Sequence, residues 1–178
     1  MSFRIEEKLS IDNSRIIDFK SFLASMAVKQ IYQRRKIESL YFDNHNYDMY
    51  TDSIEGLTPR KKIRVRNYPG TQDTNRYLEV KISSVEGRFK TRKIIDKYKF
   101  NYLKLNGIFD TQYGMCKPRL SIVYDRVYFK IDDVRISIDN NISYKLYAEN
   151  IYQSDESSIV EIKTSIRKNL DKLIEDFP

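Results

Sequence analysis

The sequence predicts an α+β fold that is mainly antiparallel β, with helices at the periphery of a sheet or barrel. Three observations favour this class. Polar and apolar residues alternate over many short stretches, which is typical of strands with one buried face. Turn-forming pairs such as Pro69-Gly70 and Glu86-Gly87 separate these stretches at short spacing. Only a few segments place apolar residues at helical spacing.

The N-terminal part of the chain alternates strands with helices. Residues 3–11 alternate polar and apolar side chains and are expected to form the first strand. Asp12 is a favourable N-cap residue, and it precedes a helix expected over residues 14–29. A second strand is expected over residues 36–42 and a short helix over residues 46–54.

Hairpins dominate the rest of the chain, because Pro, Gly, Asp and Asn bound its apolar runs. The expected strands cover residues 59–68, 76–83, 88–96, 118–130, 134–142, 144–150 and 158–164. Two helices are expected, over residues 97–109 and from residue 165 to the C-terminus. Eight or nine strands with short connections favour one antiparallel sheet or barrel. No linker divides the chain, so residues 1–178 are expected to form a single domain.

The composition favours an anionic partner. The chain has 178 residues, and its 32 basic and 25 acidic residues give a net charge of +7. Such a balance suits nucleic acid, nucleotides, polyphosphate or anionic lipid. The single cysteine, Cys116, excludes an internal disulfide, and the single histidine, His45, lies in a polar loop. No apolar stretch is long enough to span a membrane and no export signal is present, so a cytoplasmic location is expected.

The strand faces that carry charge are more informative than the total charge. Arg60, Lys62, Arg64 and Arg66 alternate with Lys61, Ile63 and Val65, so one face of this strand carries four cations. Cations stacked in this way repel one another unless an anion lies between them. An ordinary solvated face is the better explanation for any single strand. The pattern recurs, however, in Glu79 with Lys81, in Arg88, Lys90 and Arg92, in Tyr124 with Arg126, in Arg135, Ser137 and Asp139, and in Glu161 with Lys163.

These faces predict a phosphate site if the sheet closes around them. Arginine matches phosphate oxygens with its planar fork of donors. The carboxylates among the cations are candidate ligands of a divalent metal, since Mg²⁺ and Mn²⁺ prefer oxygen ligands. They are Glu6, Glu79, Asp139 and Glu161. Neither a G-x-x-x-x-G-K-[ST] loop nor a G-x-G-x-x-G turn is present, so side chains would have to bind the phosphates.

Eight short motifs occur in a characteristic order. They are Arg4-x-Glu6-x-Lys8, Ser39-Leu-Tyr41-Phe42-Asp43, Arg60-x-Lys62-Ile-Arg64-x-Arg66-x-Tyr68, Leu78-Glu79-x-Lys81, Gly87-x-x-Lys90-x-Arg92, Tyr124-x-Arg126, Arg135-Ile-Ser-x-Asp139 and Glu161-x-Lys163. The ordered set covers nearly the whole chain and resembles the VTC domain of polyphosphate polymerases. This domain belongs to the triphosphate tunnel metalloenzyme group, which also contains the CYTH phosphatases and fungal-type RNA triphosphatases.

The resemblance implies a closed eight-stranded tunnel in which the terminal phosphate of ATP is transferred to a growing polyphosphate chain with Mn²⁺ or Mg²⁺. The candidate catalytic residues are Arg64, Arg66, Lys81 and Arg126. The candidate phosphate-binding residues are Lys8, Arg60, Lys62, Lys90, Arg92, Tyr124, Arg135 and Lys163. The candidate metal ligands are Glu161, Glu6 and Glu79.

Two departures from the family pattern bear on the reaction. Arg4 replaces the first glutamate of the Glu-x-Glu-x-Lys motif of CYTH hydrolases, which favours polymerase over hydrolase chemistry. The chain stops at Pro178, where VTC domains continue into a further lysine segment, so an incomplete phosphate wall or a shortened chain is expected. Neither an SPX domain nor a membrane portion is present, so no membrane insertion is expected.

Three alternatives to the polymerase stay open. One is a triphosphatase of the same fold that acts on inorganic triphosphate, nucleoside triphosphate or RNA 5′ ends. The second is a non-catalytic module that binds polyphosphate. The third is a nucleic-acid-binding module, which is less expected because cations on inward faces suit a thin linear anion better than a duplex.

Overall fold

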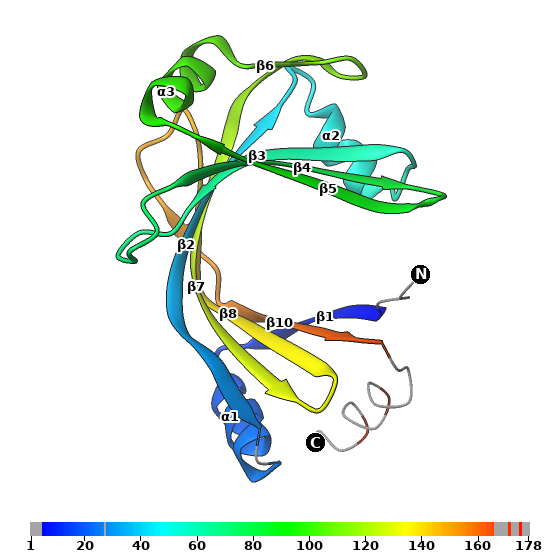
Figure 1. Cartoon of the computed structure of the whole chain (residues 1–178), viewed down its shortest axis with the longest axis vertical. Coiled ribbons are helices and arrows are strands. Elements are labelled where there is room, and N and C mark those ends of the chain that lie inside the picture. The colour runs from blue at the N-terminus through cyan, green and yellow to red at the C-terminus, as the bar shows by residue number, and fades with distance from the viewer. Residues whose placement is uncertain (1–4, 27, 166–170, 172–174, 176–178) are drawn as a thin grey trace. The chain divides into compact units, whose positions relative to one another are not determined.

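The structure is a computed structural model, and it describes residues 5–26, 28–165, 171 and 175. In this part of the chain, strands greatly outnumber helices (Figure 1). The strands are β1 (Ile5–Asp12), β2 (Lys29–Asp43), β3 (Arg60–Asn67), β4 (Arg76–Ser84), β5 (Gly87–Ile95), β6 (Ile108–Asp110), β7 (Gly114–Ile131), β8 (Val134–Leu146), β9 (Gln153–Ser154) and β10 (Ser157–Thr164). The helices are α1 (Ile16–Ser25), α2 (Asp48–Ile54) and α3 (Lys97–Asn106).

The strands form one sheet in the order β1-β10-β8-β7-β2-β3-β4-β5, with β6 paired to β7 and β9 paired to β8. The pairs β1–β10, β10–β8, β2–β3, β3–β4 and β4–β5 are antiparallel, which confirms the predicted fold class. Eight strands lie on the main path, as predicted. The prediction of a closed barrel was too strong, because no backbone pairing joins the terminal strands β1 and β5 in the described residues.

The chain divides into two compact units. Unit 1 takes in residues 1–36, 124–143 and 154–178, and unit 2 takes in residues 37–123 and 144–153. The strands β2, β7 and β8 contribute residues to both units. The assignment of the whole chain to a single domain stays a prediction.

Unit 1 has its core between α1 and the strands β8 and β10. Phe19 and Leu23 of α1 pack in the same buried cluster as Ile136 and Ile138 of β8 and Val160 of β10. Because side chains alternate along a strand, the residues between these apolar ones point to the opposite face of the sheet. The charged residues of β8 and β10 are therefore kept away from the α1 core.

Unit 2 is built in the same way around β3. Ile63 and Val65 are buried in a cluster with Met49 of α2 and Leu103 of α3. The intervening residues of β3 carry the cations that were predicted to share a face. Figure 1 shows β3, β4 and β5 side by side, with α2 and α3 as the helices of this unit.

A glycine explains one difference between the predicted and the observed elements. A helix was expected over residues 97–109, but α3 ends at Asn106 and β6 follows it. Gly107 adopts a φ of +84°, and a Cβ at this position would lie 2.5 Å from the carbonyl oxygen of Cys116 on β7. Only glycine permits this backbone conformation and this close approach to β7. The helix therefore ends before Gly107, and the residues that follow pair with β7 as β6.

Other boundaries moved by a few residues or more. The second strand begins at Lys29 rather than at Lys36, and residues 144–146 form the end of β8 rather than part of a separate strand. α1 begins at Ile16 and has no side-chain cap, so the predicted capping by Asp12 was wrong. Most of the helix predicted from residue 165 to the C-terminus lies outside the described residues, as does Arg4. No described helix has the length and apolar character that crossing a membrane would require.

Candidate functional site

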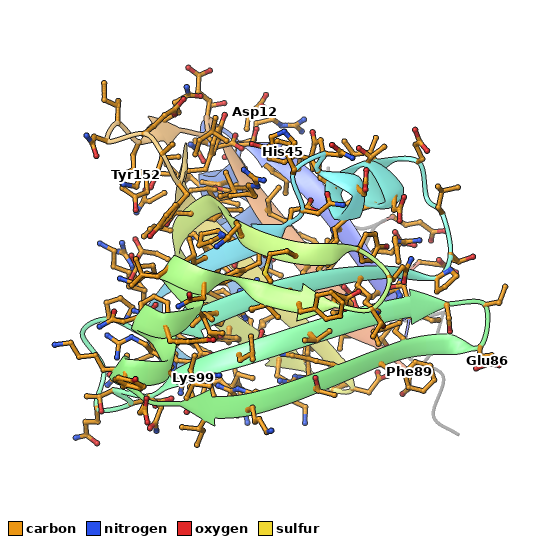
Figure 2. The ribbon with its side chains drawn as sticks, turned by 90° about the horizontal axis from the view of Figure 1, so that it is seen from above. Asp12, His45, Glu86, Phe89, Lys99 and Tyr152 are labelled. Atoms are coloured by element: carbon orange, nitrogen blue, oxygen red, sulfur yellow. The ribbon has the colours of Figure 1, made fainter. Side chains whose placement is uncertain are left out.

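The strands β3, β4 and β5 present a positively charged surface in unit 2, which we call the basic face. It consists of Lys62, Arg64, Arg66, Glu79, Lys81, Lys90 and Arg92. Strand pairing aligns six of these residues in two rows across the sheet, because Arg64 lies opposite Glu79 and Glu79 opposite Arg92, while Lys81 lies between Lys62 and Lys90. Arg66 lies opposite Tyr77, beside the first row. Figure 2 shows the three strands side by side, with Glu86 and Phe89 near the turn that joins β4 to β5. The structure thus brings together seven of the predicted site residues.

A single carboxylate lies at the centre of the basic face. Glu79 is only 2% exposed, and its Oε2 accepts hydrogen bonds from Nε of Arg64 at 2.8 Å and Nη2 of Arg64 at 2.7 Å. Its Oε1 accepts a hydrogen bond from Nζ of Lys90 at 2.7 Å. Nε of Arg92 lies 3.6 Å from Oε1, and Nη1 of Arg66 lies 3.9 Å from Oε2. Glu79 therefore holds four cations near one point.

The cations keep Glu79 ionised. Burial by itself raises the pKa of the carboxyl group, since it penalises the charged form. The hydrogen bond from Lys90 and the charges of Arg64 and Arg66 outweigh burial, so the pKa of Glu79 lies below its usual range. One negative charge still leaves a large positive excess among the six cations of the face.

Two polar side chains of β2 orient the arginines of β3. Nη1 of Arg64 donates to the hydroxyl of Tyr41 at 2.8 Å, and Nε of Arg66 donates to Oγ of Ser39 at 3.2 Å. Tyr41 and Ser39 are the cross-strand partners of these arginines. Sequence reasoning gave neither residue a role in the site. Their alternation along β2 was visible, but only the β2–β3 register shows which arginines they face.

Arg60 was predicted to bind phosphate, but the structure places its side chain elsewhere. Nη1 of Arg60 donates to the carbonyl oxygens of Gly56 and Leu57 at 3.2 and 3.0 Å. These contacts tie the start of β3 to the loop that follows α2. Arg60 is therefore engaged apart from the cluster around Glu79.

The remaining predicted site residues lie in unit 1, on β1, β7, β8 and β10. Glu161 is flanked by Nζ of Lys8 at 3.5 Å and by Nζ of Lys163 at 3.1 Å. Nζ of Lys163 also lies 3.9 Å from Glu6. Strand pairing aligns Glu6 with Lys163 and Lys163 with Arg135. The predicted phosphate ligands and metal ligands of this unit thus form one cluster.

The carboxyl groups of Glu6 and Glu161 lie 3.9 and 3.1 Å from the same Nζ of Lys163, which makes them a pair of neighbouring oxygen donors. Burial raises the pKa of Glu161, but the neighbouring Glu6 and the charges of Lys163 and Lys8 outweigh burial and hold the pKa below its usual range. Two carboxylates fit Mg²⁺ or Mn²⁺, which are commonly held by one or two carboxylates together with phosphate and water oxygens.

The third predicted metal ligand, Glu79, belongs to unit 2 and has cations as neighbours. Across the described residues, no group of three or more His, Cys, Asp or Glu side chains is arranged to hold a metal ion. The pair of Glu6 and Glu161 is thus the part of the predicted donor set that the structure brings together.

Arg126 of β7 forms a two-point ion pair in unit 1. Its Nε and Nη2 donate to the two carboxylate oxygens of Asp139 at 2.5 and 2.6 Å. Burial alone would lower the pKa of Arg126, but the paired hydrogen bonds raise it above its ordinary value. The guanidinium carbon lies 5.3 Å from the ring centroid of Tyr124, as the shared strand face predicts. Asp139, a candidate metal ligand by sequence, is in this structure the partner of Arg126.

Comparison with known proteins identifies the family. The model of the VTC domain matches residues 3–176. The chain belongs to the VTC domain family. This confirms the resemblance that was drawn from the eight motifs. A comparison with curated protein sequences finds no significant match.

Solved structures share the fold of this VTC domain at low sequence identity. A candidate adenylate cyclase from Bacillus halodurans has a TM-score of 0.65 and 12% identity, over 98% of this chain and 87% of that protein. A second candidate adenylate cyclase, from Vibrio parahaemolyticus, has a TM-score of 0.61 and 13% identity, over 99% and 88%. A conserved hypothetical protein from Pyrococcus furiosus has a TM-score of 0.58 and 17% identity, over 97% and 87%. At these identities the likeness concerns the fold alone.

Proposed function

We propose that this VTC domain is a metal-dependent phosphotransferase that moves the terminal phosphate of ATP to a polyphosphate chain. The observation that carries the proposal is the basic face of a chain of the VTC family, which bears six cations, four of them within 4 Å of one buried carboxylate. Such an excess of oriented donors suits an anion with several phosphates, because each phosphate adds acceptor oxygens at short spacing.

On the basic face, the arginines have the central role in this proposal. Phosphoryl transfer depends on positioning and on neutralising the charge of the transferred group. Arg64 is held by Tyr41 and Glu79, so its donors are fixed before any phosphate arrives. Preorganised donors stabilise developing charge without reorganising during the reaction. Arg66, Lys90 and Arg92 would hold neighbouring phosphates in the same way.

Unit 1, taken by itself, carries candidate metal ligands on its charged face. Glu6 and Glu161 would hold Mn²⁺ or Mg²⁺, with Lys8 and Lys163 nearby to bind phosphate oxygens. Such an ion, when bound, neutralises and polarises phosphate oxygens as a Lewis acid. Arg126 is kept charged and fixed by Asp139, so it is a further candidate for binding phosphate.

The direct test is to incubate the purified chain with ATP and Mn²⁺ and to resolve the products by phosphorus NMR and gel electrophoresis. Long-chain polyphosphate supports the proposal. If only free phosphate forms, the proposed polymerase activity is wrong and the chain is a triphosphate hydrolase. Bound tripolyphosphate without turnover replaces it with a binding module.

An Arg64→Ala variant tests the role of the basic face. The loss of one donor that stabilises transition-state charge typically lowers turnover by roughly a hundredfold or more. Lys93→Ala is a matched control, since Lys93 lies on β5 next to Arg92 but points to the opposite face, across from Leu78. Unchanged turnover in Arg64→Ala, or an equal loss in Lys93→Ala, would contradict the assignment.

A further inference from the structure

Unit 2 contains a second feature beside the basic face, a cavity of about 580 Å³ that we call the tyrosine pocket. Four tyrosines line it, namely Tyr41, Tyr47, Tyr50 and Tyr144. Its other walls are largely apolar, and Lys62 and Arg119 are among the few cations that reach it. Pockets for small molecules usually measure about 300–1,000 Å³ and combine apolar walls with a few polar groups. The tyrosine pocket has the size and lining of such a site.

Three of these tyrosines keep much of their ring surface exposed. The exposed fractions of Tyr47, Tyr50 and Tyr144 are 39%, 62% and 37%. Aromatic rings that serve only as core are normally buried, as Phe42 is on the neighbouring β2. Exposed rings gathered in one cavity offer stacking surfaces to a flat aromatic ligand.

The tyrosine pocket adjoins the basic face through shared residues. Tyr41 lines the pocket and accepts the hydrogen bond from Arg64 at 2.8 Å. Lys62 also lines the pocket, and it stands opposite Lys81 in the second row of the basic face. Asp43, Arg119, Lys145 and Glu149 also line the pocket, and Lys62 and Tyr41 are the lining residues that connect it to the cations of the basic face.

We infer that the tyrosine pocket binds the base and ribose of a nucleoside triphosphate whose phosphates lie on the basic face. This inference rests on the proposed function, and it adds a nucleoside site to the phosphate site. A flat base suits the tyrosine rings, and the triphosphate suits the adjoining cations. Stacking on aromatic rings tolerates different bases. The pocket should therefore bind nucleotides more tightly than bare triphosphate, and it should distinguish only weakly between one base and another.

The test compares the binding of ATP, GTP and tripolyphosphate by calorimetry in wild type and in Tyr50→Ala. Tyr50 is on α2, where alanine favours the helix, and it has no part in the cluster around Glu79. Loss of one base–aromatic stack weakens binding by roughly tenfold. We expect this loss for ATP and GTP, with tripolyphosphate affinity unchanged. Tyr50→Phe should restore nucleotide affinity because it keeps the ring.

A matched control is Tyr98→Ala, which removes an exposed tyrosine of α3 that does not line the pocket. It should leave all three affinities unchanged. The inference is overturned if wild type binds ATP no better than tripolyphosphate, if Tyr50→Ala leaves nucleotide affinity unchanged, or if it weakens tripolyphosphate equally. A wild-type protein that does not bind tripolyphosphate at all refutes the proposed function itself, so the two failures are distinguishable.

Discussion

At the scale of single residues, Glu79 is the most informative position of this VTC domain. Sequence reasoning made it a metal ligand, but its neighbours in unit 2 are four cations. A carboxylate in such surroundings offsets repulsion among the cations and orients their donors. In the proposed function, the negative charge of Glu79 balances the cations of the basic face while no phosphate is bound.

Glu79→Gln should destabilise the protein without ligand and should increase the gain in Tm that an anionic ligand produces. Removal of the carboxylate charge leaves the cations of the cluster uncompensated, so we expect the free energy of unfolding to fall by about 1–3 kcal/mol. The loss is moderate because Lys90 and Arg92 are partly hydrated. Tripolyphosphate supplies the missing negative charge, so it should raise the Tm of the variant more than that of wild type. Thermal unfolding with and without tripolyphosphate measures both effects.

The control for this variant is Glu86→Gln, which changes an exposed glutamate in the turn between β4 and β5 (Figure 2). It should behave like wild type. Equal Tm gains from tripolyphosphate in wild type and Glu79→Gln would contradict the counter-ion role. If Mn²⁺ raises the Tm of wild type but not that of Glu79→Gln, Glu79 is a metal ligand after all.

Cys116 shows how a residue that invites a catalytic role is explained by packing. It is fully buried in the core of unit 2, and burial raises the pKa of its thiol to about 11. A thiol with so high a pKa is almost wholly protonated near neutral pH and is a poor nucleophile. Cys116 is therefore explained by its packing in the core of unit 2.

At the scale of elements, β6 is joined to β3 by a partly buried ion pair. The carboxylate of Asp110 accepts hydrogen bonds from Nζ of Lys61 at 3.1 and 2.9 Å. Its Oδ1 also accepts from the backbone amides of Gln112 and Tyr113 at 2.9 and 3.2 Å. Lys61 lies on β3 next to Lys62 of the basic face and points to the opposite side of the sheet. The pair thus anchors the back of the strand that carries Arg64.

Asp110→Asn should lower the free energy of unfolding by about 1–3 kcal/mol at neutral pH, since Lys61 loses its charged partner. Burial raises the pKa of Asp110, but Lys61 and the two amides outweigh it and hold the pKa below the usual value of 3.8. A depressed pKa means that the stabilisation is complete above the unfolded pKa and is lost as the pH falls through the folded pKa.

Thermal unfolding of wild type and Asp110→Asn from about pH 7 to about pH 3 measures this effect. The difference in Tm should be largest near neutral pH and should shrink at the acidic end. Asp132→Asn, a change of an exposed aspartate in the turn between β7 and β8, is the control and should show little difference. A Tm difference that does not depend on pH would contradict the role of the ion pair.

At the scale of the whole molecule, the net charge of +7 does not by itself distinguish a polyphosphate from a nucleic acid. The accessibility of the two arginines of β3 bears on this choice, while Lys90 and Arg92 are 46% and 43% exposed. The side chains of Arg66 and Arg64 are only 9% and 23% exposed, because they are held against Glu79 and β2. Recessed cations suit a thin linear anion, whereas a duplex needs cations that project from the surface.

Tripolyphosphate should therefore displace the protein from duplex DNA. The measurement is competition for a fluorescent duplex at about 150 mM salt, where non-specific duplex binding is weak. We expect tripolyphosphate to bind with higher affinity than the duplex and to abolish its binding. Sulfate at equal ionic strength is the control for screening. Tight duplex binding that tripolyphosphate leaves unchanged would favour a nucleic-acid-binding module.

The sequence by itself determined the fold class, the order of most elements and the residues of the charged faces. It did so because strand alternation is a local property, so Ile63 and Val65 necessarily face away from Arg64 and Arg66. The eight motifs also determined the family. These features depend on neighbours in the chain and need no knowledge of the partner strands.

Only the tertiary structure decided which charges meet. Glu79 and Glu161 follow the same alternation in sequence, but strand pairing surrounds Glu79 with cations and brings Glu161 to Glu6. The roles of Tyr41 and Ser39 and the break at Gly107 likewise depend on contacts with a neighbouring strand. Register and close packing join residues that are distant in sequence, and periodicity carries no information about either.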